Sequence, residues 1–338
     1  MREDYVLIDL FSGGGGYARG FVDTGRYRHV LGVDNYPPAA RTYTVNFPSA
    51  QFIADDIKEV TGRLIRDYTG IGRGEVDVIT ASPPCEPFTG ANPKRMRDPL
   101  DRLYRDPAGQ LFLHAIRLIG ELQPRVFIIE NVPGIMEAPI RRSIRAELAR
   151  VGYDTVYFNV LRAEEHGTPS RRIRVFVSNI RLQPARSKPP TVWEALKDLP
   201  PPGSPYPPNH EAGQIPSRHR RRLPRLRWGE SLITYQGAKR RLPNYIRLHP
   251  YRIAPTVMGT SRFIHPFEDR LLTVREQARL MGFPDYHVFV GSRDAQYDMV
   301  GEAVPPPLAR SIALVAAGVL DNYYSDHTRH SLEEREAR

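Results

Sequence analysis

Cysteine is nearly missing from this chain of 338 residues, which contains a single one, Cys85. One thiol excludes an internal disulfide and a zinc site built from several cysteines, and we expect no metal site. Long apolar runs are also missing: the mean hydropathy is -0.45, and no stretch approaches the ~20 apolar residues of a membrane span. The N-terminus lacks the basic start and apolar core of a signal peptide. We therefore expect a soluble, cytoplasmic protein without a membrane partner.

Acidic residues are outnumbered by basic ones, 38 against 48, so the formal net charge is +10. Most of this excess lies in residues 211–252, where eleven arginines and lysines accompany only two acidic residues. A local concentration of positive charge predicts a polyanionic partner, whereas the net charge alone would fit solubility equally well.

The first part of the chain alternates short apolar runs with amphipathic stretches, a pattern that predicts an α/β, doubly wound, mostly parallel sheet. Strands are expected at residues 5–11, 29–34, 76–81, 126–130, 155–160 and 172–178. Helices are expected between them at residues 16–24, 37–46, 58–68, 109–122 and 140–151.

A sharp change of composition follows, with ten prolines in residues 183–216. We place a boundary there because neither a helix nor a central strand tolerates such a run. A folded module and a flexible basic linker both fit the proline- and arginine-rich segment 183–264, and we favour the folded module. Helices are expected again at residues 271–282 and 308–320, and the tail after Tyr324 is expected to fray at the surface.

A glycine-rich segment at residues 9–16 follows the first predicted strand and opens a helix. Such a turn lets the backbone approach a ligand and offers free N–H groups, although some glycine turns are only tight turns. Asp34 ends the next strand, where a carboxylate can accept both ribose hydroxyls, or simply face solvent. Asp56 fits an adenine contact or a helix N-cap.

Three further strand ends carry candidate chemistry. Cys85 lies in a proline-rich turn after a strand, where an exposed thiol can be activated by nearby guanidinium groups. Glu130 closes the next apolar strand and is either a satisfied carboxylate or a general acid. Arg172 and Arg174 share one face of a strand, as surface charges or as a site for an anionic substrate.

Taken in order, these motifs resemble the DNA (cytosine-5) methyltransferase family of bacterial or phage type. The resemblance extends to residues 106–112, 270–276, 279–285 and 301–306, and it covers most of the chain outside residues 183–264. It implies a Rossmann-like S-adenosylmethionine-dependent methyltransferase sheet with a small inserted target recognition domain. The implied division is a catalytic and cofactor-binding domain at 1–182, a recognition region at 183–264 and a return to the catalytic domain at 265–338.

The resemblance also implies the reaction. The Cys85 thiolate would add to C6 of a cytosine flipped out of duplex DNA while Glu130 protonates N3, and C5 would then take a methyl group from S-adenosylmethionine. Loop 86–105 would clamp the flipped base, and Arg172 and Arg174 would hold its nucleotide. The residues expected to contact the cofactor are Phe11, Gly13, Gly15, Asp34, Asp56, Ile57 and Val304. Those expected to contact DNA are Arg218, Arg220, Arg221, Arg222, Arg225, Arg227, Lys239, Arg240 and Arg241. We also expect a monomer, with a cognate restriction endonuclease as a further partner.

Three positions near the expected pocket depart from the family's usual pattern. Glu86 follows the cysteine where glutamine is common, Ser170 stands where glutamine precedes the arginine pair, and Glu302 replaces an asparagine. The added negative charge can raise the pKa of Cys85, alter the flipping loop or change which cofactor group fits, while neutral drift is the plainer account. We hypothesise that Glu302 alters the choice of cofactor or transferred group.

Two other functions compete with this one. The tRNA cytosine-5 branch of the family shares the Pro-Pro-Cys turn but carries a second cysteine in its target region, which this chain lacks. A catalytically silent DNA-binding relative would keep the fold without the chemistry. Intact Cys85, Glu130 and Arg174 argue against that alternative.

Overall fold

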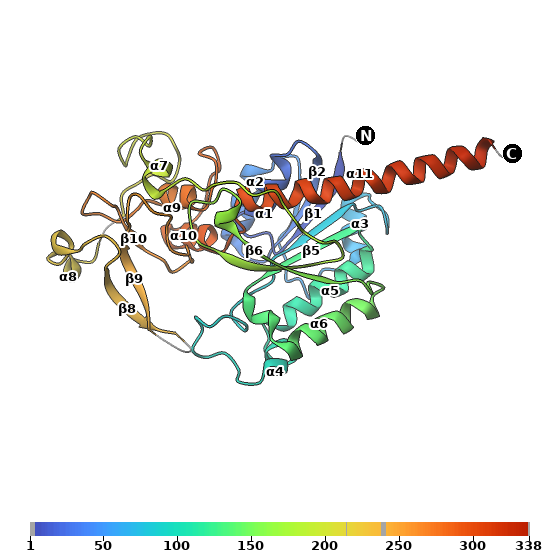
Figure 1. Ribbon diagram of the computed structural model, residues 1–338, viewed down its shortest axis with the longest axis horizontal. Coiled ribbons are helices and arrows are strands. Elements are labelled where there is room, and N and C mark those ends of the chain that lie inside the picture. The colour runs from blue at the N-terminus through green and yellow to red at the C-terminus, as the bar shows by residue number, and fades with distance from the viewer. Residues whose placement is uncertain (1–3, 214, 238–240, 337–338) are drawn as a thin grey trace.

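The structure is a computed structural model that describes residues 4–213, 215–237 and 241–336. Its centre is a seven-stranded sheet with strand order β3-β2-β1-β4-β5-β7-β6, covered by helices on both faces (Figure 1). The strands are β1 (Tyr5–Leu10), β2 (Tyr27–Val33), β3 (Gln51–Ile53), β4 (Val78–Ala81), β5 (Val126–Asn131), β6 (Tyr157–Arg162) and β7 (Ile173–Ser178). The expected α/β fold with a mostly parallel sheet is confirmed.

Two details of the sheet differ from the sequence prediction. β3 was not expected as a strand, because three residues at an exposed edge are too short to show a period of two. β7 runs antiparallel to both of its neighbours, β5 and β6. This reversal matters for function, because it brings the first residues of β7 to the edge where β4 and β5 end.

Alternating side chains of β1 show why the sheet is covered on both faces. All six residues of β1 are buried. Tyr5 and Leu7 belong to the cluster that packs under α1 (Gly16–Val22) and α11 (Pro306–Glu336). Val6, Ile8 and Leu10 belong to the opposite cluster, under α3 (Gly62–Thr69), α5 (Gln110–Leu122) and α6 (Ala138–Arg150). A strand that is buried on both faces and mostly apolar is typical of such a core.

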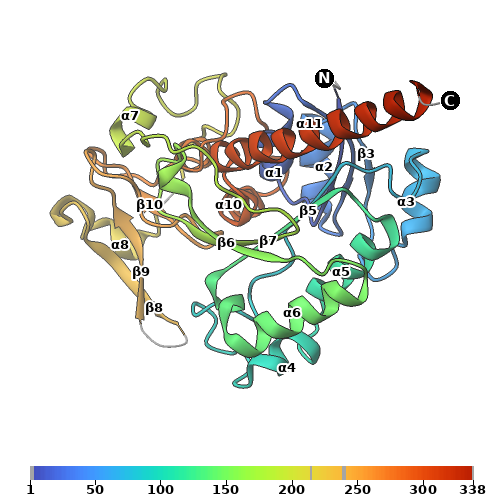
Figure 2. The ribbon, with the colours of Figure 1, turned by 45° about the vertical axis from the view of Figure 1, so that its right-hand side comes forward.

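The proline- and arginine-rich region forms a second, smaller sheet at one end of the molecule (Figure 2). β8 (Ser231–Gln236) and β9 (Arg241–Arg247) make an antiparallel hairpin, and β10 (Phe263–Ile264) pairs with β9 in parallel. Ile215, Leu223 and Leu232 form part of its own small apolar core. The segment is therefore folded.

The remaining helices connect these sheets and frame the site. They are α2 (Pro37–Asn46), α4 (Pro99–Tyr104), α7 (Val192–Leu196), α8 (Ser217–Arg220), α9 (Val274–Leu280) and α10 (Arg293–Glu302), with short 3-10 turns η1 (Pro133–Met136), η2 (Ala163–Glu165) and η3 (Leu223–Arg225). The helix expected at 271–282 is α9, which begins at a capping box formed by Thr273 and Glu276.

The last helix is longer than predicted, because α11 continues to Glu336 through the tail that was expected to fray. An ion pair of 2.6 Å between Arg26 and Asp321 fastens it to the start of β2. Residues 293–326 also hold an 18-residue window of mean hydropathy 1.5, which by length and composition alone could cross a membrane. That window is 56% buried within the protein, as is typical of a core helix.

Gly301 near the end of α10 is a site where a side chain has no room. A Cβ atom there would lie 2.1 Å from the carbonyl carbon of Met258. We expect Gly301→Ala to destabilise the fold by about 1–3 kcal/mol, because backbone atoms must move apart. Gly318→Ala is the matched control, since Gly318 lies in α11 with no atom within 4 Å of a new Cβ. It should stabilise the protein by about 0.5–1 kcal/mol in urea unfolding. Equal effects of the two substitutions would contradict this account.

Candidate active site

The loop after β4 presents Cys85 at the edge of the sheet. The carbonyl oxygen of Cys85 accepts hydrogen bonds from the backbone N–H groups of Phe88 (3.0 Å) and Thr89 (2.9 Å), which close the turn. The Asn131 side chain donates to the carbonyl of Pro83 at 3.0 Å and ties this loop to the end of β5. Sequence reasoning missed Asn131 as a positioning residue, although its place beside Glu130 at a strand end was visible.

Glu130 and Arg174 meet on neighbouring strands. Glu130, on β5, is only 5% exposed, and the Arg174 Nε lies 2.9 Å from its Oε1. β4 and β5 are adjacent parallel strands, so Cys85 and Glu130 follow neighbouring strand ends as expected. The antiparallel direction of β7 adds Arg174 to the same edge. A thiol, a carboxyl group and a guanidinium are thus collected at the ends of three neighbouring strands.

Arg172 stands apart from this group because both terminal nitrogens of its guanidinium already donate to backbone carbonyls. It is 2% exposed, and its guanidinium donates to the carbonyl oxygens of Val257 (3.0 Å), Gly301 (2.9 Å) and Glu302 (3.2 Å). Burial, and then the charge of Arg174, lowers its pKa to about 9. These contacts favour a positioning role over a contact with the nucleotide.

The surroundings of Cys85 do not make its thiol acidic. Burial is the main cause that raises its pKa to about 11, and the negative charge of Glu86 adds to it. Arg174 and Arg172 act in the opposite direction but do not outweigh burial. The guanidinium groups therefore act on the thiol pKa in the expected direction but are outweighed by burial, and the effect foreseen for Glu86 is confirmed in direction.

Replacing Glu86 by glutamine should make Cys85 more reactive. Removing a negative charge lowers the thiol pKa, and below that pKa the thiolate fraction rises tenfold per unit of decrease. We expect alkylation of the single cysteine by iodoacetamide at pH 8 to become about two- to tenfold faster. Glu59→Gln is the control, because Glu59 is an exposed carboxylate that is not among the charges that mainly shift the Cys85 pKa. If the alkylation rate depended on pH in the same way in Glu86→Gln and in the unmodified protein, Glu86 would not raise the pKa of Cys85.

The glycine-rich loop joins β1 to α1 and faces the end of β2. The Gly13 N–H donates to Asp34 at 2.8 Å, and the Tyr36 N–H donates to the other Asp34 oxygen at 2.9 Å. Gly15 has φ 79°, and a Cβ there would lie 2.5 Å from the ring of Phe47, so only glycine fits. The buried hydroxyl of Ser12 has no hydrogen-bond partner among the described residues. The loop therefore offers a polar cradle with an unused donor.

The other expected cofactor contacts are placed less directly. Phe11 packs at the edge of the main core with φ 54°. Asp56 accepts a hydrogen bond from the Lys58 N–H at 3.0 Å, as an acid that caps a turn does. Ile57 and Val304 are buried in the two opposite core clusters, so their contact with a cofactor remains a prediction.

Glu302 lies among other acids. Its side chain reaches the surface, yet the surrounding protein and the carboxylates of Glu86, Asp298 and Asp34 raise its pKa to about 7. Ser170, the third departure, is fully buried against Met281, and its backbone forms a bridge with Ala254. Two of the three departures thus place acid at the site, and the third is a core residue.

A buried network beneath the glycine loop was not expected from the sequence. Asp9 is 1% exposed and accepts hydrogen bonds from Thr80 (2.6 Å) and Tyr43 (3.3 Å). The Tyr43 hydroxyl also lies 2.8 Å from His29 Nε2. Burial raises the pKa of Asp9 to about 7. The network fixes α2 to β1 directly below the glycine-rich turn.

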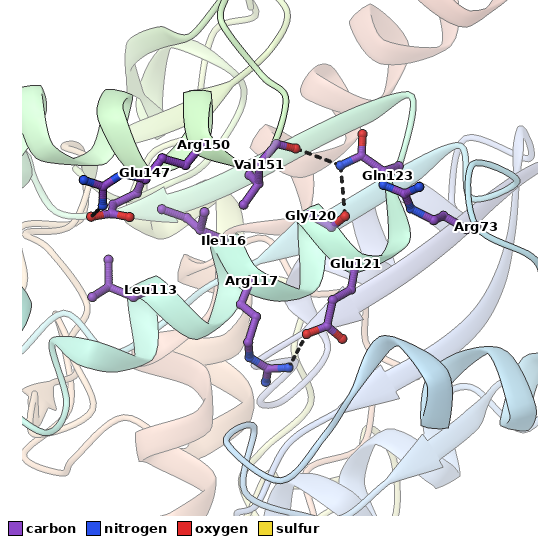
Figure 3. Close-up of a pocket in the computed structure, with 10 residues that line it drawn as sticks. All are labelled: Arg73, Leu113, Ile116, Arg117, Gly120, Glu121, Gln123, Glu147, Arg150 and Val151. Carbon is purple, nitrogen blue, oxygen red and sulfur yellow. Dashed lines mark hydrogen bonds and ion pairs between the residues drawn. The ribbon is translucent and has the colours of Figure 1, made fainter.

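A separate groove lies far from this edge, on the outer face of α5 and α6 (Figure 3). Its walls include Arg117 and Glu121, which pair with each other at 2.8 Å. None of the residues assigned to chemistry lines it. Within the described part of the chain, no cluster of three or more His, Cys, Asp or Glu side chains has a metal-binding arrangement.

The basic residues assigned to DNA contact are mostly exposed on the small sheet and its approaches. Arg218 and Arg220 belong to α8, and Arg241 begins β9. Lys239 and Arg240 lie outside the described residues.

The sequence profile of the C-5 cytosine-specific DNA methylase family matches residues 5–316. The chain belongs to this family. Its fold is that of the S-adenosylmethionine-dependent methyltransferases, and it is a DNA cytosine-5 methyltransferase. Enzymes of this family transfer a methyl group to cytosine in DNA, and their family and fold imply S-adenosylmethionine as the donor.

Relatives extend over nearly the whole chain. The type II methyltransferase M.MjaORF1200P of Methanocaldococcus jannaschii, itself provisionally named, is 44% identical, with 91% of this chain and 97% of the relative covered. M1.HphI of Haemophilus parahaemolyticus, another type II methyltransferase, is 32% identical, with 91% and 85% covered. Type II methyltransferases belong to restriction–modification systems.

Solved structures of the family share the fold. A DNA modification methyltransferase encoded within an Escherichia coli prophage, also provisionally named, superposes with a TM-score of 0.75 at 24% identity. The match covers 94% of this chain and 99% of that one.

Proposed function

We propose that this enzyme transfers the methyl group of S-adenosylmethionine to C5 of a cytosine flipped out of duplex DNA, through a covalent bond between Cys85 and C6. The observation that supports it best is the collection of Cys85, Glu130 and Arg174 at one sheet edge, with Glu130 paired to Arg174 at 2.9 Å. A nucleophile and an oriented carboxyl group at neighbouring strand ends are what addition to an unreactive pyrimidine requires.

Each residue then has a role at a stated atom. The Cys85 thiol releases its proton to solvent and its sulfur forms a bond to C6. Glu130, which has taken up a proton from solvent, donates that proton to N3, and electron density moves to C5. Arg174 holds the Glu130 carboxyl group in place and stabilises its anion after the proton has left. When C5 has been alkylated, the C5 proton leaves to solvent, the C5–C6 double bond forms again as the bond from C6 to sulfur breaks, and the N3 proton returns to Glu130, which restores the Cys85 thiolate.

The raised pKa of Cys85 is consistent with a nucleophile that reacts only in the assembled complex. Loop 86–105 is proposed to close over the flipped base and exclude water. When the loop closes, the polar flipped cytosine lies against the Cys85 sulfur in place of apolar surroundings. Its oriented dipoles then stabilise the charged thiolate.

The glycine-rich loop is proposed to hold the cofactor. The unused Ser12 hydroxyl, the N–H groups of the loop and the Asp34 carboxylate fit a ligand that carries hydroxyl and ammonium groups. S-adenosylmethionine supplies an electrophilic methyl group on a sulfonium. The three acids near Glu302 suit a cationic ligand, and Glu302 is also the residue proposed to influence which group is transferred.

Several assignments about the whole protein remain proposals. Residues 1–182 are the catalytic and cofactor-binding domain, 183–264 the recognition region and 265–338 the return to the catalytic domain. The enzyme acts as a cytoplasmic monomer on double-stranded DNA, within a bacterium or a phage-infected cell, alongside a cognate restriction endonuclease.

The test is covalent capture on DNA that holds many sequences. A PCR product of several kilobases made with 5-fluorodeoxycytidine cannot lose the C5 substituent, so the enzyme should remain attached through Cys85 when S-adenosylmethionine is present. Peptide mass spectrometry locates the adduct. No adduct on any such DNA would overturn the mechanism. Nucleoside mass spectrometry of ordinary methylated DNA tests the separate hypothesis for Glu302, and plain 5-methylcytosine at normal rates would count against it.

A further inference from the structure

Six arginines at the approach to the small sheet have no carboxylate partner. Arg218 to Arg227 cover α8, η3 and the turn before β8, and the six arginines in this segment are all exposed: Arg218, Arg220, Arg221, Arg222, Arg225 and Arg227. Within the described residues, no guanidinium group of the six forms an ion pair with an acidic side chain, although the Arg227 backbone N–H donates to the Glu230 carboxylate at 2.9 Å. We call this segment the arginine segment.

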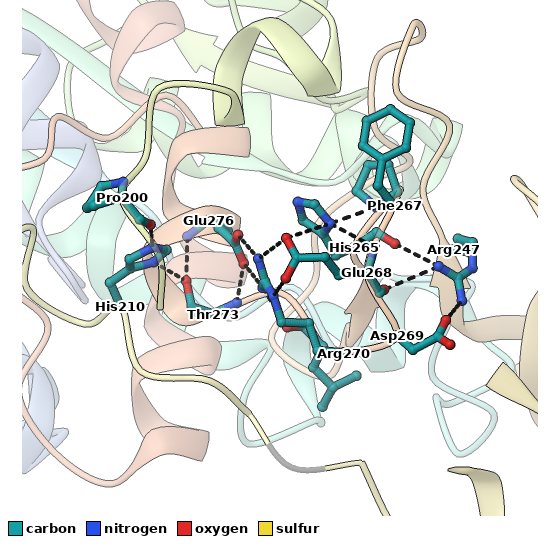
Figure 4. A network of polar contacts seen from close by, with 12 residues as sticks. Pro200, His210, Arg247, His265, Phe267, Glu268, Asp269, Arg270, Thr273 and Glu276 are labelled. Carbon is teal, nitrogen blue, oxygen red and sulfur yellow. Dashed lines mark hydrogen bonds and ion pairs between the residues drawn. The ribbon is translucent and has the colours of Figure 1, made fainter. Parts of the chain in front are cut away.

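Three arginines further along the chain behave differently. Arg247 pairs with Asp269, and Arg270 pairs with Glu276 at 2.8 Å and with Glu268 at 2.7 Å (Figure 4). Arg262 pairs with Asp294 at 2.7 Å. These paired arginines hold the fold together, with Arg247 nearly buried. The contrast shows that the arginine segment keeps its charge for an anion outside the protein.

The position of the arginine segment is unusual for residues that read a target. It precedes Ser231 and so lies at the root of the β8–β9 hairpin, pinned there by a hydrogen bond of 3.0 Å from Arg222 to the Leu232 carbonyl. Figures 1 and 2 both show α8 on the side of the hairpin away from the loop that precedes α4. The six residues of β8 span about 20 Å, which equals about six base pairs of duplex.

We infer that the arginine segment binds the phosphate backbone of duplex DNA outside the target sequence, on the flank next to the hairpin root. This inference rests on the proposed function, in which the flipped cytosine lies at the Cys85 edge of the large sheet. Guanidinium groups bind phosphate oxygens bidentately without reading sequence. The segment therefore lengthens the DNA footprint and fixes the orientation of the duplex, and sequence is read elsewhere.

The test compares two variants that lose the same charge. In the first, Arg218, Arg221, Arg225 and Arg227 are replaced by glutamine, while Arg220 and Arg222, which hold carbonyl groups, are kept. In the control, four exposed arginines elsewhere are replaced by glutamine: Arg28, Arg141, Arg142 and Arg310. Fluorescence anisotropy measures binding to random-sequence DNA duplexes of ~12 and ~36 base pairs over a range of salt concentrations.

We expect the first variant to lose about two to three and a half units of the slope of log K against log salt on the long duplex, and the control to lose less than about one. On the short duplex both variants should bind like the unmodified protein.

Equal weakening on both lengths would mean that the arginines lie over the target, and no change on either length would mean that they do not touch DNA. The inference would also be overturned if the protein bound an RNA duplex more tightly than DNA and the first variant lost only this difference in affinity. None of these measurements involves methyl transfer, so a failure of the proposed chemistry would show separately, as absence of Cys85 adducts.

Discussion

Cys85→Ser should lower methyl transfer by more than about a thousandfold, because the chain then has no thiol to add to C6. A serine hydroxyl is nearly the same size but is far less nucleophilic. Among the residues that the structure describes, no side chain that could take its proton is hydrogen-bonded to the side chain at that position. The measurement is transfer of labelled methyl from S-adenosylmethionine to plasmid DNA in single-turnover conditions. Half-burial of Cys85 makes the exchange tolerable for the fold.

Two controls separate chemistry from structure. The thermal unfolding midpoint and the affinity for duplex DNA should change little in the serine variant, because the backbone hydrogen bonds that close the turn do not involve the sulfur. The 5-fluorodeoxycytidine adduct should vanish completely. Transfer within tenfold of the unmodified rate would place the nucleophile elsewhere and remove the basis of the mechanism.

Glu130→Gln should lower the rate of transfer by about a hundred- to ten-thousandfold, since the amide cannot donate a proton to N3. This variant also leaves the charge of Arg174 without its partner in a mostly buried place. Such a change destabilises a protein by up to about 3–5 kcal/mol, so rates must be measured well below the new unfolding midpoint.

Glu130→Asp distinguishes the two effects. Aspartate keeps the negative charge next to Arg174 but withdraws the carboxyl group by one methylene, so stability should largely return while transfer stays at least about a hundredfold below normal. A variant that recovered rate in proportion to stability would show that Glu130 serves only to hold Arg174. Adduct formation with fluorinated DNA should be slowed in parallel, because N3 protonation accompanies the attack of sulfur.

The site could be predicted from sequence where it depends on strand direction. Parallel strands end at the same edge of a sheet, and Cys85 and Glu130 each follow an apolar run. If their two strands are adjacent, the two residues must therefore be neighbours. The same reasoning placed Asp34 opposite the glycine-rich loop, where it accepts the Gly13 N–H.

Other features depend on contacts between residues distant in sequence. The hydrogen-bond acceptors of Arg172 are backbone carbonyls 85 to 130 positions away in the sequence. Because every residue has a carbonyl group, no pattern of side chains predicts which carbonyl will accept. The raised pKa of Cys85 results from how much protein surrounds the sulfur, which residue types alone do not reveal. The ion pair that anchors α11, between Arg26 and Asp321, joins residues from nearly opposite ends of the chain.

The hydrogen bond from Arg172 to the Val257 carbonyl limits how much of the proposed recognition region can be replaced by that of another enzyme. The Arg172 guanidinium joins the start of the strand that carries Arg174 to the segment between β9 and β10 and to the end of α10. Gly301 lets the Met258 backbone lie against that helix end. Ala254 is tied to the same strand start, because the Arg171 N–H donates to its carbonyl at 2.9 Å. A graft into the proposed recognition region should therefore retain residues 254–259 of this enzyme if the catalytic edge is to keep these contacts.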